Sequence, residues 1–106
     1  MVEKNPIIRL YFAKLKEAWY KLSEEEKQEF MGKDIENLEE LGCKIKMMID
    51  CRWSNKEWHF IGVEEWPTLE ALQKRAAFEE EELKASRYAE SKTYLGNLQS
   101  DEYTQL

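Results

Sequence analysis

The stretch CKIKMMIDCRWSNKEWHFIGVEEW, residues 43–66, decides the fold predicted for this chain. From Cys43 to Trp53 the side chains follow a period of two, which is the pattern of a half-buried β-strand. Residues 54–57 form a polar run suited to a tight reversal, and residues 58–66 have the composition of a second strand. Gly62 takes a position where a side chain is expected to be unwelcome. The stretch therefore predicts a β-hairpin.

A strand and a helix are predicted before the hairpin. Residues 7–13 alternate between two sides of a strand, one with Ile8, Leu10 and Phe12 and the other with Arg9, Tyr11 and Ala13. A helix is predicted over residues 23–42, because Ser23 and Glu26 form an S-x-x-E capping box and Gly42 suits a helix end. Its expected buried stripe consists of Phe30, Met31, Ile35, Leu38 and Leu41.

A second helix and a final strand are predicted after the hairpin. Pro67 and Thr68 end the strand and cap the helix. Its expected apolar stripe consists of Leu69, Leu72, Ala76 and Leu83, and residues 79–82, four consecutive glutamates, are expected on the solvated side. Residues 88–95 predict a weaker strand, which precedes Gly96 and a polar tail.

The predicted order of elements is strand, helix, strand, strand, helix, strand. This order predicts an α+β fold, a ferredoxin-like βαββαβ sandwich in which a four-stranded antiparallel sheet carries two helices on one face. We expect one domain over residues 1–106, with a core over 7–97 and a tail over 98–106. The uncovered sheet face carries too many large side chains to face water, so we expect a homodimer that buries it.

Charge and cysteine content exclude several classes of partner. The 106 residues carry a net charge of -6, and the 16 lysines and arginines form no dense cluster, so we expect no nucleic acid partner. No apolar run is long enough to span a membrane, so we expect no membrane partner. Cys43 and Cys51 would lie too far apart along one strand to pair, which favours a reducing, cytoplasmic location. Two cysteines and one histidine also predict no metal site.

The run HFIGVEEWPTLEAL, residues 59–72, passes from the third strand into the second helix and resembles the dimeric α/β-barrel superfamily. That ferredoxin-like group includes antibiotic-biosynthesis monooxygenases and EthD-like proteins, and the resemblance covers about residues 7–97. It implies two sheets packed face to face, with a ligand cavity inside the barrel or between each sheet and its own helices. The haem-degrading branch uses an Asn on the first strand, where this chain has Arg9 and Tyr11, and we expect no cofactor.

Four residues are candidates for catalysis. If residues 54–57 form the turn, then Arg52 faces His59 and Asp50 lies diagonally on the same face. An Asp, Arg and His cluster can orient an imidazole as a general base, and Tyr11 is the fourth candidate. The alternative is that these residues form a solvated polar patch at the hairpin tip.

Aromatic residues are candidates for ligand binding, because together they could line a pocket for a flat, mostly apolar molecule. The candidates are Trp58, Phe60, Trp66, Trp19 and Tyr94. The alternative is that they form core or dimer contacts. Glu64 and Glu65 fall on opposite faces of the third strand, so one of them is expected to be partly buried and paired with a lysine.

Three functional hypotheses follow. The first is a small homodimeric enzyme, similar to the cofactor-independent monooxygenases, that acts on an aromatic or apolar molecule. The second is a non-catalytic protein that binds a small ligand or another protein. The third is an acidic accessory subunit, which would expose a further apolar patch outside the dimer contact.

Overall fold

The structure, a computed structural model, describes residues 6–98, so most of the predicted tail lies outside it. Within these described residues, nine elements follow one another. They are β1 (Ile7–Leu15), α1 (Glu17–Tyr20), α2 (Glu24–Glu40), β2 (Lys44–Asp50), β3 (Phe60–Trp66), α3 (Leu69–Phe78), the π-helical turn η1 (Glu79–Leu83), α4 (Ala85–Tyr88) and β4 (Ala89–Gly96). The short elements α1, η1 and α4 flank the two main helices.

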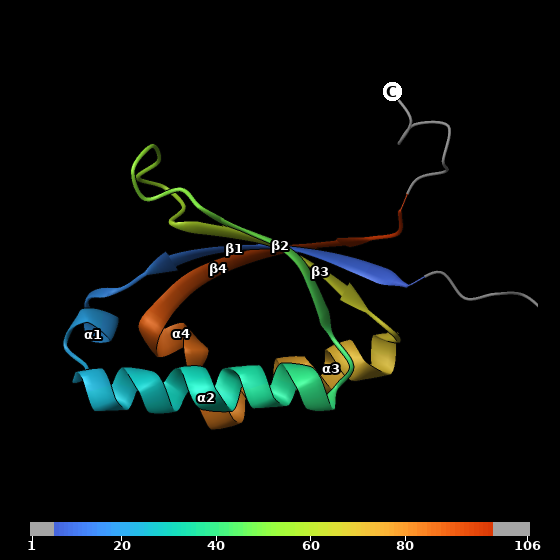
Figure 1. The fold of residues 1–106 in the computed structure, drawn as a ribbon, viewed down its shortest axis with the longest axis horizontal. Helices are drawn as coiled ribbons and strands as arrows, with labels where there is room; N and C mark the ends of the chain where they lie inside the picture. The colour runs from blue at the N-terminus through green and yellow to red at the C-terminus, as the bar shows by residue number, and fades with distance from the viewer. Residues whose placement is uncertain (1–5, 99–106) are drawn as a thin grey trace, which may run out of the picture.

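The four strands form one antiparallel sheet in the order β2-β3-β1-β4. All the labelled helices lie under one face of this sheet, and none covers the opposite face (Figure 1). This is the βαββαβ arrangement of a ferredoxin-like fold. The predicted α+β class, with two main helices on one face of a four-stranded antiparallel sheet, is therefore confirmed.

The hairpin is present, but its predicted register is wrong. β2 ends at Asp50, which pairs with Phe60, so the connection covers residues 51–59 instead of 54–57. Arg52 lies outside the ladder. The loop is longer because Asn55 Oδ1 accepts hydrogen bonds from the backbone N–H groups of Glu57 and Trp58, at 2.7 and 3.0 Å. These bonds hold the backbone in a local turn that competes with strand pairing.

Helix α2 begins and ends as the sequence predicts. The Ser23 hydroxyl accepts from the Glu26 N–H at 3.0 Å, and the Glu26 carboxylate accepts from the Ser23 N–H at 2.9 Å, which completes the capping box. At the other end Gly42 has a φ of +79°, a left-handed conformation that side chains disfavour. A Cβ atom on Gly42 would also lie 3.3 Å from Cγ of Pro67.

β1 divides its side chains between the two sheet faces as predicted. Arg9 and Ala13 are buried toward the helices, and the β3 residues paired with this side include Glu64 opposite Arg9. The other side we call the open face, because no helix within residues 6–98 covers it. Its apolar residues are Ile8, Leu10, Phe12, Met47, Ile49, Ile61, Val63 and Tyr94.

The core lies where α2 and α3 meet the helix-facing side of β3. It consists of Leu38, Trp66, Ala71 and Leu72, with Trp66 fully buried. The predicted stripes are only partly correct. Met31 and Ile35 of α2 are exposed, and Leu69 and Ala76 of α3 are exposed, because the buried side of α3 is rotated toward Ala71, Leu72 and Arg75.

Candidate functional site

A cavity of about 210 Å³ lies between the helix-facing side of the sheet and the helices. We call it the internal cavity. β1 supplies four of its lining residues, Arg9, Tyr11, Ala13 and Leu15, which are alternate positions on one strand. Alternate residues of a strand point the same way, so β1 lines the cavity along much of its length. Elements β2, α2, η1 and α4 supply further lining residues.

The internal cavity has an apolar mouth between α2 and β2. Ile35 of α2 and Ile45 and Met48 of β2 all line the cavity. They are nevertheless 55%, 50% and 53% exposed, so they lie where the cavity meets solvent. A ligand that enters there first meets aliphatic side chains.

One end of the internal cavity is aromatic. Trp19, Phe30 and Tyr88 line it, and we call them the aromatic cluster. Their rings meet edge to face, with centroids 5.2 Å apart for Trp19 and Phe30 and 5.6 Å apart for Phe30 and Tyr88. The Lys16 N–H donates to the Tyr88 carbonyl at 2.8 Å, which places this cluster at the C-terminal end of β1.

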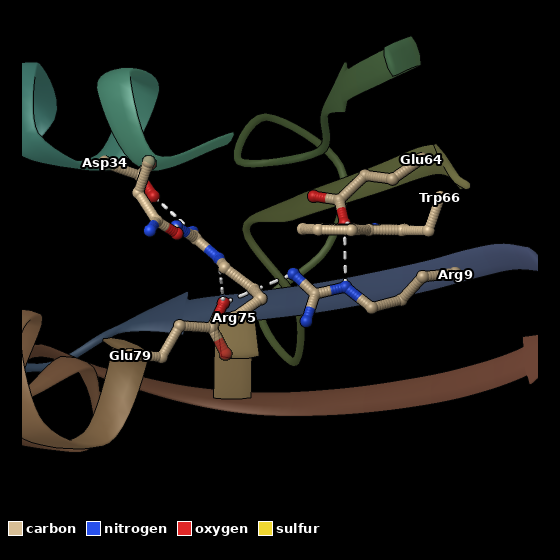
Figure 2. Close-up of polar contacts among 7 residues, drawn as sticks. Arg9, Asp34, Glu64, Trp66, Arg75 and Glu79 are labelled. Carbon is tan, nitrogen blue, oxygen red and sulfur yellow. Dashed lines mark hydrogen bonds and ion pairs between the residues drawn. The ribbon is translucent and has the colours of Figure 1, made fainter. Parts of the chain in front are cut away.

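The other end of the internal cavity is polar. Arg9 Nε donates to Glu64 Oε1 at 2.7 Å, and Arg9 Nη2 donates to Glu79 Oε2 at 3.2 Å. Figure 2 shows the Arg9 guanidinium between the Glu64 carboxylate on β3 and the Glu79 carboxylate on η1. The Arg9 and Glu64 side chains are 7% and 5% exposed, so this is a buried ion pair.

Arg75 extends the same network to α2. Its Nε donates to Glu79 Oε2 at 2.9 Å and its Nη1 donates to Asn37 Oδ1 at 2.9 Å. Its Nη2 is ion-paired with Asp34. Both arginines thus meet at one oxygen of Glu79, and Figure 2 shows the chain of contacts from α2 to β3. We call Arg9, Asp34, Asn37, Glu64, Arg75 and Glu79 the polar cluster.

Two aromatic rings hold the Arg9 guanidinium. Its central carbon lies 4.7 Å from the Tyr11 ring centroid and 5.7 Å from the Trp66 ring centroid. The Trp66 indole N–H also donates to Glu64 Oε1 at 2.9 Å. Because Glu64 accepts from both Arg9 and Trp66, the carboxylate is fixed in place beside the cavity.

Burial and charge set the protonation of this region. Burial, together with the charge of Glu79, raises the pKa of Tyr11 to about 12. Burial acts to lower the pKa of Arg9, but Glu64 and Glu79 outweigh it, so the pKa of Arg9 is raised. At neutral pH the cavity therefore contains a neutral phenol and a charged guanidinium. The phenol can donate a hydrogen bond to a ligand.

Three of the four predicted catalytic residues lie at the hairpin. Arg52 Nη2 donates to Asp50 Oδ2 at 2.8 Å, and both side chains are about half exposed. Arg52 hydrogen bonds lower the pKa of Asp50 to about 2. His59 Nδ1 accepts the Leu15 backbone N–H at 3.0 Å. None of these three lines the internal cavity, whereas Tyr11 does. Their catalytic role stays a prediction.

The predicted ligand-binding aromatic residues fall into separate places. Trp19 lines the cavity and Trp66 belongs to its polar end. Tyr94 lies on the open face, where its ring is 6.1 Å from that of Phe12, and Trp58 contacts the same Phe12 ring at 5.7 Å. Phe60 packs under the Arg52 guanidinium at 4.9 Å. The structure therefore does not bring these five residues into one pocket.

Sequence reasoning missed most of the polar cluster. The sequence placed Arg9 on the first strand but predicted no ion pair for it. Glu79 was expected on the solvated side of the second helix, together with the three glutamates that follow it. In the structure its side chain is 22% exposed and points inward. One signal was available, because Arg75 and Glu79 are spaced i, i+4. One of Glu64 and Glu65 was expected to be partly buried and paired with a lysine. Glu64 is the buried one, but its partner is Arg9. The lysine, Lys46, pairs instead with Glu65 at 3.8 Å.

Metal-binding clusters and membrane-spanning helices are both absent from the described part of the chain. No group of three or more His, Cys, Asp or Glu side chains within residues 6–98 could hold a metal ion. In the same range, no helix is long and apolar enough to cross a membrane.

Comparison with known proteins gives a likeness of fold. No protein family matches the sequence, and neither does any curated protein. A crystal structure described as a putative chlorite dismutase is similar, with a TM-score of 0.65 and 19% sequence identity. The match covers 93% of this chain and 47% of that chain, so this chain spans about half the length of the structure that it matches. The likeness supports the ferredoxin-like α+β fold described above.

Proposed function

We propose that this protein binds a small, mostly apolar molecule in the internal cavity and that it works as a homodimer. The observation that carries the proposal is the cavity itself, which is apolar at its mouth and at one end and has fixed polar groups at the other. Ligand sites are typically concave and apolar, with a few convergent polar groups that orient the ligand.

The volume of the internal cavity sets the size of the ligand. An engineered apolar cavity of about 150 Å³ binds benzene. The internal cavity is larger, at about 210 Å³. A molecule of one aromatic ring with a short substituent, or an aliphatic molecule of similar size, therefore fits.

Binding is favoured over catalysis because the candidate acid and base groups lie away from the cavity. His59 Nδ1 is already occupied by the Leu15 N–H, and Asp50 is occupied by Arg52. The proposal of monooxygenase-like chemistry retains Tyr11, which lines the cavity as a neutral phenol. A non-catalytic ligand-binding protein is the simpler conclusion.

The open face supports the proposal of a homodimer. Its exposed residues include Met47, Ile49 and Tyr94, which are 55%, 42% and 53% exposed in the protomer. The neighbouring side chains on β1 and β3 are also apolar. Two copies that pack these faces together would remove these apolar side chains from water.

The ligand-binding proposal is tested by thermal unfolding with benzyl alcohol and toluene as probes. Both are expected to raise Tm in a saturable way, because a ligand that binds only the folded state stabilises it by mass action. Ala13 is 7% exposed and lines the cavity, so Ala13→Leu is expected to fill it and to abolish the shift.

The matched control is Ala77→Leu, which makes the same change at an exposed position of α3. This variant is expected to keep the wild-type shift. The circular dichroism spectrum of unliganded Ala13→Leu checks that it is folded. An equal shift in both variants, or no shift for the wild-type protein, would show that the cavity is not a binding site.

A further inference from the structure

The carboxylates at the polar end of the internal cavity outnumber the guanidinium groups. Glu64, Glu79 and Asp34 face Arg9 and Arg75, and all five residues line the cavity. With these groups ionised, the polar end carries one net negative charge. A polar ligand group in this partly enclosed place is therefore favoured if it is positive, because charges interact more strongly where water is partly excluded.

The two arginines are already ion-paired with carboxylates of the protein. All three nitrogens of the Arg75 guanidinium contact Glu79, Asn37 or Asp34. Two of the three Arg9 nitrogens, Nε and Nη2, donate to Glu64 and Glu79. An anionic ligand would have to displace these buried pairs, which leaves a carboxylate without its partner and is unfavourable.

The carboxylates keep accepting capacity for a further donor. Arg9 and Trp66 share Oε1 of Glu64, both arginines share Oε2 of Glu79, and Arg75 contacts Oδ1 of Asp34. Figure 2 draws contacts to one oxygen of each of these carboxylates, so the second oxygen of each makes no contact with the residues drawn. An ammonium group has three donors and no acceptor, which complements such a set.

The aromatic cluster suits the rest of such a ligand. Tyr11 lies between Arg9 and Ala13 along β1, and thus between the polar end and the aromatic end. A ring placed beyond Tyr11 meets Trp19, Phe30 and Tyr88. Faces of aromatic rings also attract a cation, so they do not oppose its entry.

We infer that the internal cavity selects small amines, with the ammonium group at Asp34 and Glu79 and an aromatic or aliphatic body toward the aromatic cluster. This inference rests on the proposed function, because it assigns a ligand class to the same cavity. The combination that carries it is a partly enclosed, largely apolar cavity whose polar end places three carboxylates against two ion-paired guanidinium groups.

The experiment compares four probes that share one ring. Benzylamine, benzyl alcohol, toluene and benzoate are titrated into the wild-type protein at pH 7, and binding is measured by calorimetry and by the shift in Tm. Benzylamine is expected to bind about tenfold or more tightly than benzyl alcohol, since a charge-assisted hydrogen bond is stronger than a neutral one. Benzoate is expected to show no binding.

A charge variant tests the origin of the preference. Asp34→Asn removes the excess negative charge, so the preference for benzylamine is expected to fall to about threefold or less, while toluene binding is unchanged. If Asp34→Asn does not fold, Glu79→Gln removes the same charge. Glu39→Gln is the control, because Glu39 is an exposed residue of α2 that does not line the cavity. It is expected to keep the wild-type preference.

The outcomes separate the inference from the proposed function. If toluene and benzyl alcohol bind but benzylamine is not preferred, the inference is wrong and the proposed function stands. The inference is also overturned if benzoate binds as tightly as benzylamine, or if Asp34→Asn and Glu39→Gln show the same preference. If none of the four probes binds, the inference and the proposed function are both wrong.

Discussion

At the scale of single residues, Arg9 joins the sheet to the helical layer through Glu64 and Glu79. Replacing it by Met keeps the length of the side chain but leaves Glu64 buried without its cation. Loss of one partner of a buried ion pair typically costs about 3–5 kcal/mol, so Arg9→Met is expected to lower the free energy of unfolding by this amount. Urea denaturation followed by circular dichroism measures it.

The comparison for Arg9→Met is Lys21→Met, which removes an exposed partner of Glu17. The Lys21 and Glu17 side chains are 73% and 82% exposed, so this pair is expected to contribute less than about 1 kcal/mol. Similar losses in the two variants would contradict the structural role given to Arg9.

Tyr11 provides a prediction of pH dependence. Its pKa of about 12 exceeds the ordinary value of about 10, so the folded state holds the phenol proton more tightly than the unfolded state. The sign follows: this contribution to stability is complete below about pH 10 and is lost as pH rises toward 12. The phenolate absorbance of wild-type protein minus that of Tyr11→Phe is expected to show one step near pH 12. A step near pH 10 would mean that Tyr11 is solvated.

The residue scale also shows where sequence reasoning stops. Alternation along β1 correctly placed Arg9 and Tyr11 on one face, and Glu64 was correctly considered for burial. Which carboxylate meets which cation depends on strand pairing and on the turn after α3, and neither is encoded in local spacing. Apart from the i, i+4 pair of Arg75 and Glu79, the polar cluster was therefore not predictable from local patterns.

At the scale of elements, local chemistry predicted α2 well and the hairpin less well. Ser23, Glu26 and Gly42 act on their own neighbours, so the ends of α2 could be predicted from sequence. Gly62 was also correctly singled out, since a Cβ there would lie 3.0 Å from Cε of Met48. The predicted hairpin register was wrong because the Asn55 turn holds residues beyond Asp50 in the loop. A separate irregularity between Ile45 and Met47 interrupts the strict alternation of β2.

The π-helical turn η1 was not predicted, and it determines where Glu79 points. Lys84 ends this turn in the left-handed conformation, with φ 53° and ψ 46°. A residue with a side chain is disfavoured there and glycine is not, so Lys84→Gly is expected to raise the free energy of unfolding by about 0.5–1 kcal/mol. Chemical denaturation measures the change.

The reference for Lys84→Gly is Lys74→Gly, at an exposed position inside α3. Glycine in a helix interior costs about 1 kcal/mol relative to good helix formers, so this variant is expected to lose stability. The two substitutions should therefore change stability in opposite directions. A loss in both would mean that Lys84 does not hold a left-handed conformation in solution.

At the scale of the whole molecule, the helical layer covers one sheet face and the open face remains (Figure 1). The sequence predicted this asymmetry because the element order alone places both main helices on one side. The resemblance implied a cavity inside the barrel or between the sheet and its own helices. It did not identify the residues that line the internal cavity, because these depend on how α2 and η1 pack against the sheet. A measurement of the oligomeric state in solution tests the proposed dimer.

Ile49 offers that test, because it lies on the open face and is 42% exposed in the protomer. A single protomer should tolerate Lys at this position. In a symmetric dimer, however, Ile49→Lys places two charges in one apolar contact, where burial of an unpaired charge is strongly unfavourable. Sedimentation at micromolar concentration is therefore expected to give a dimer for the wild-type protein and a folded monomer for Ile49→Lys. Leu69→Lys is the control on the helical side, at a side chain that is 54% exposed, and is expected to leave the dimer intact. A wild-type monomer, or a dimer that survives Ile49→Lys, would mean that the open face is not the contact between copies.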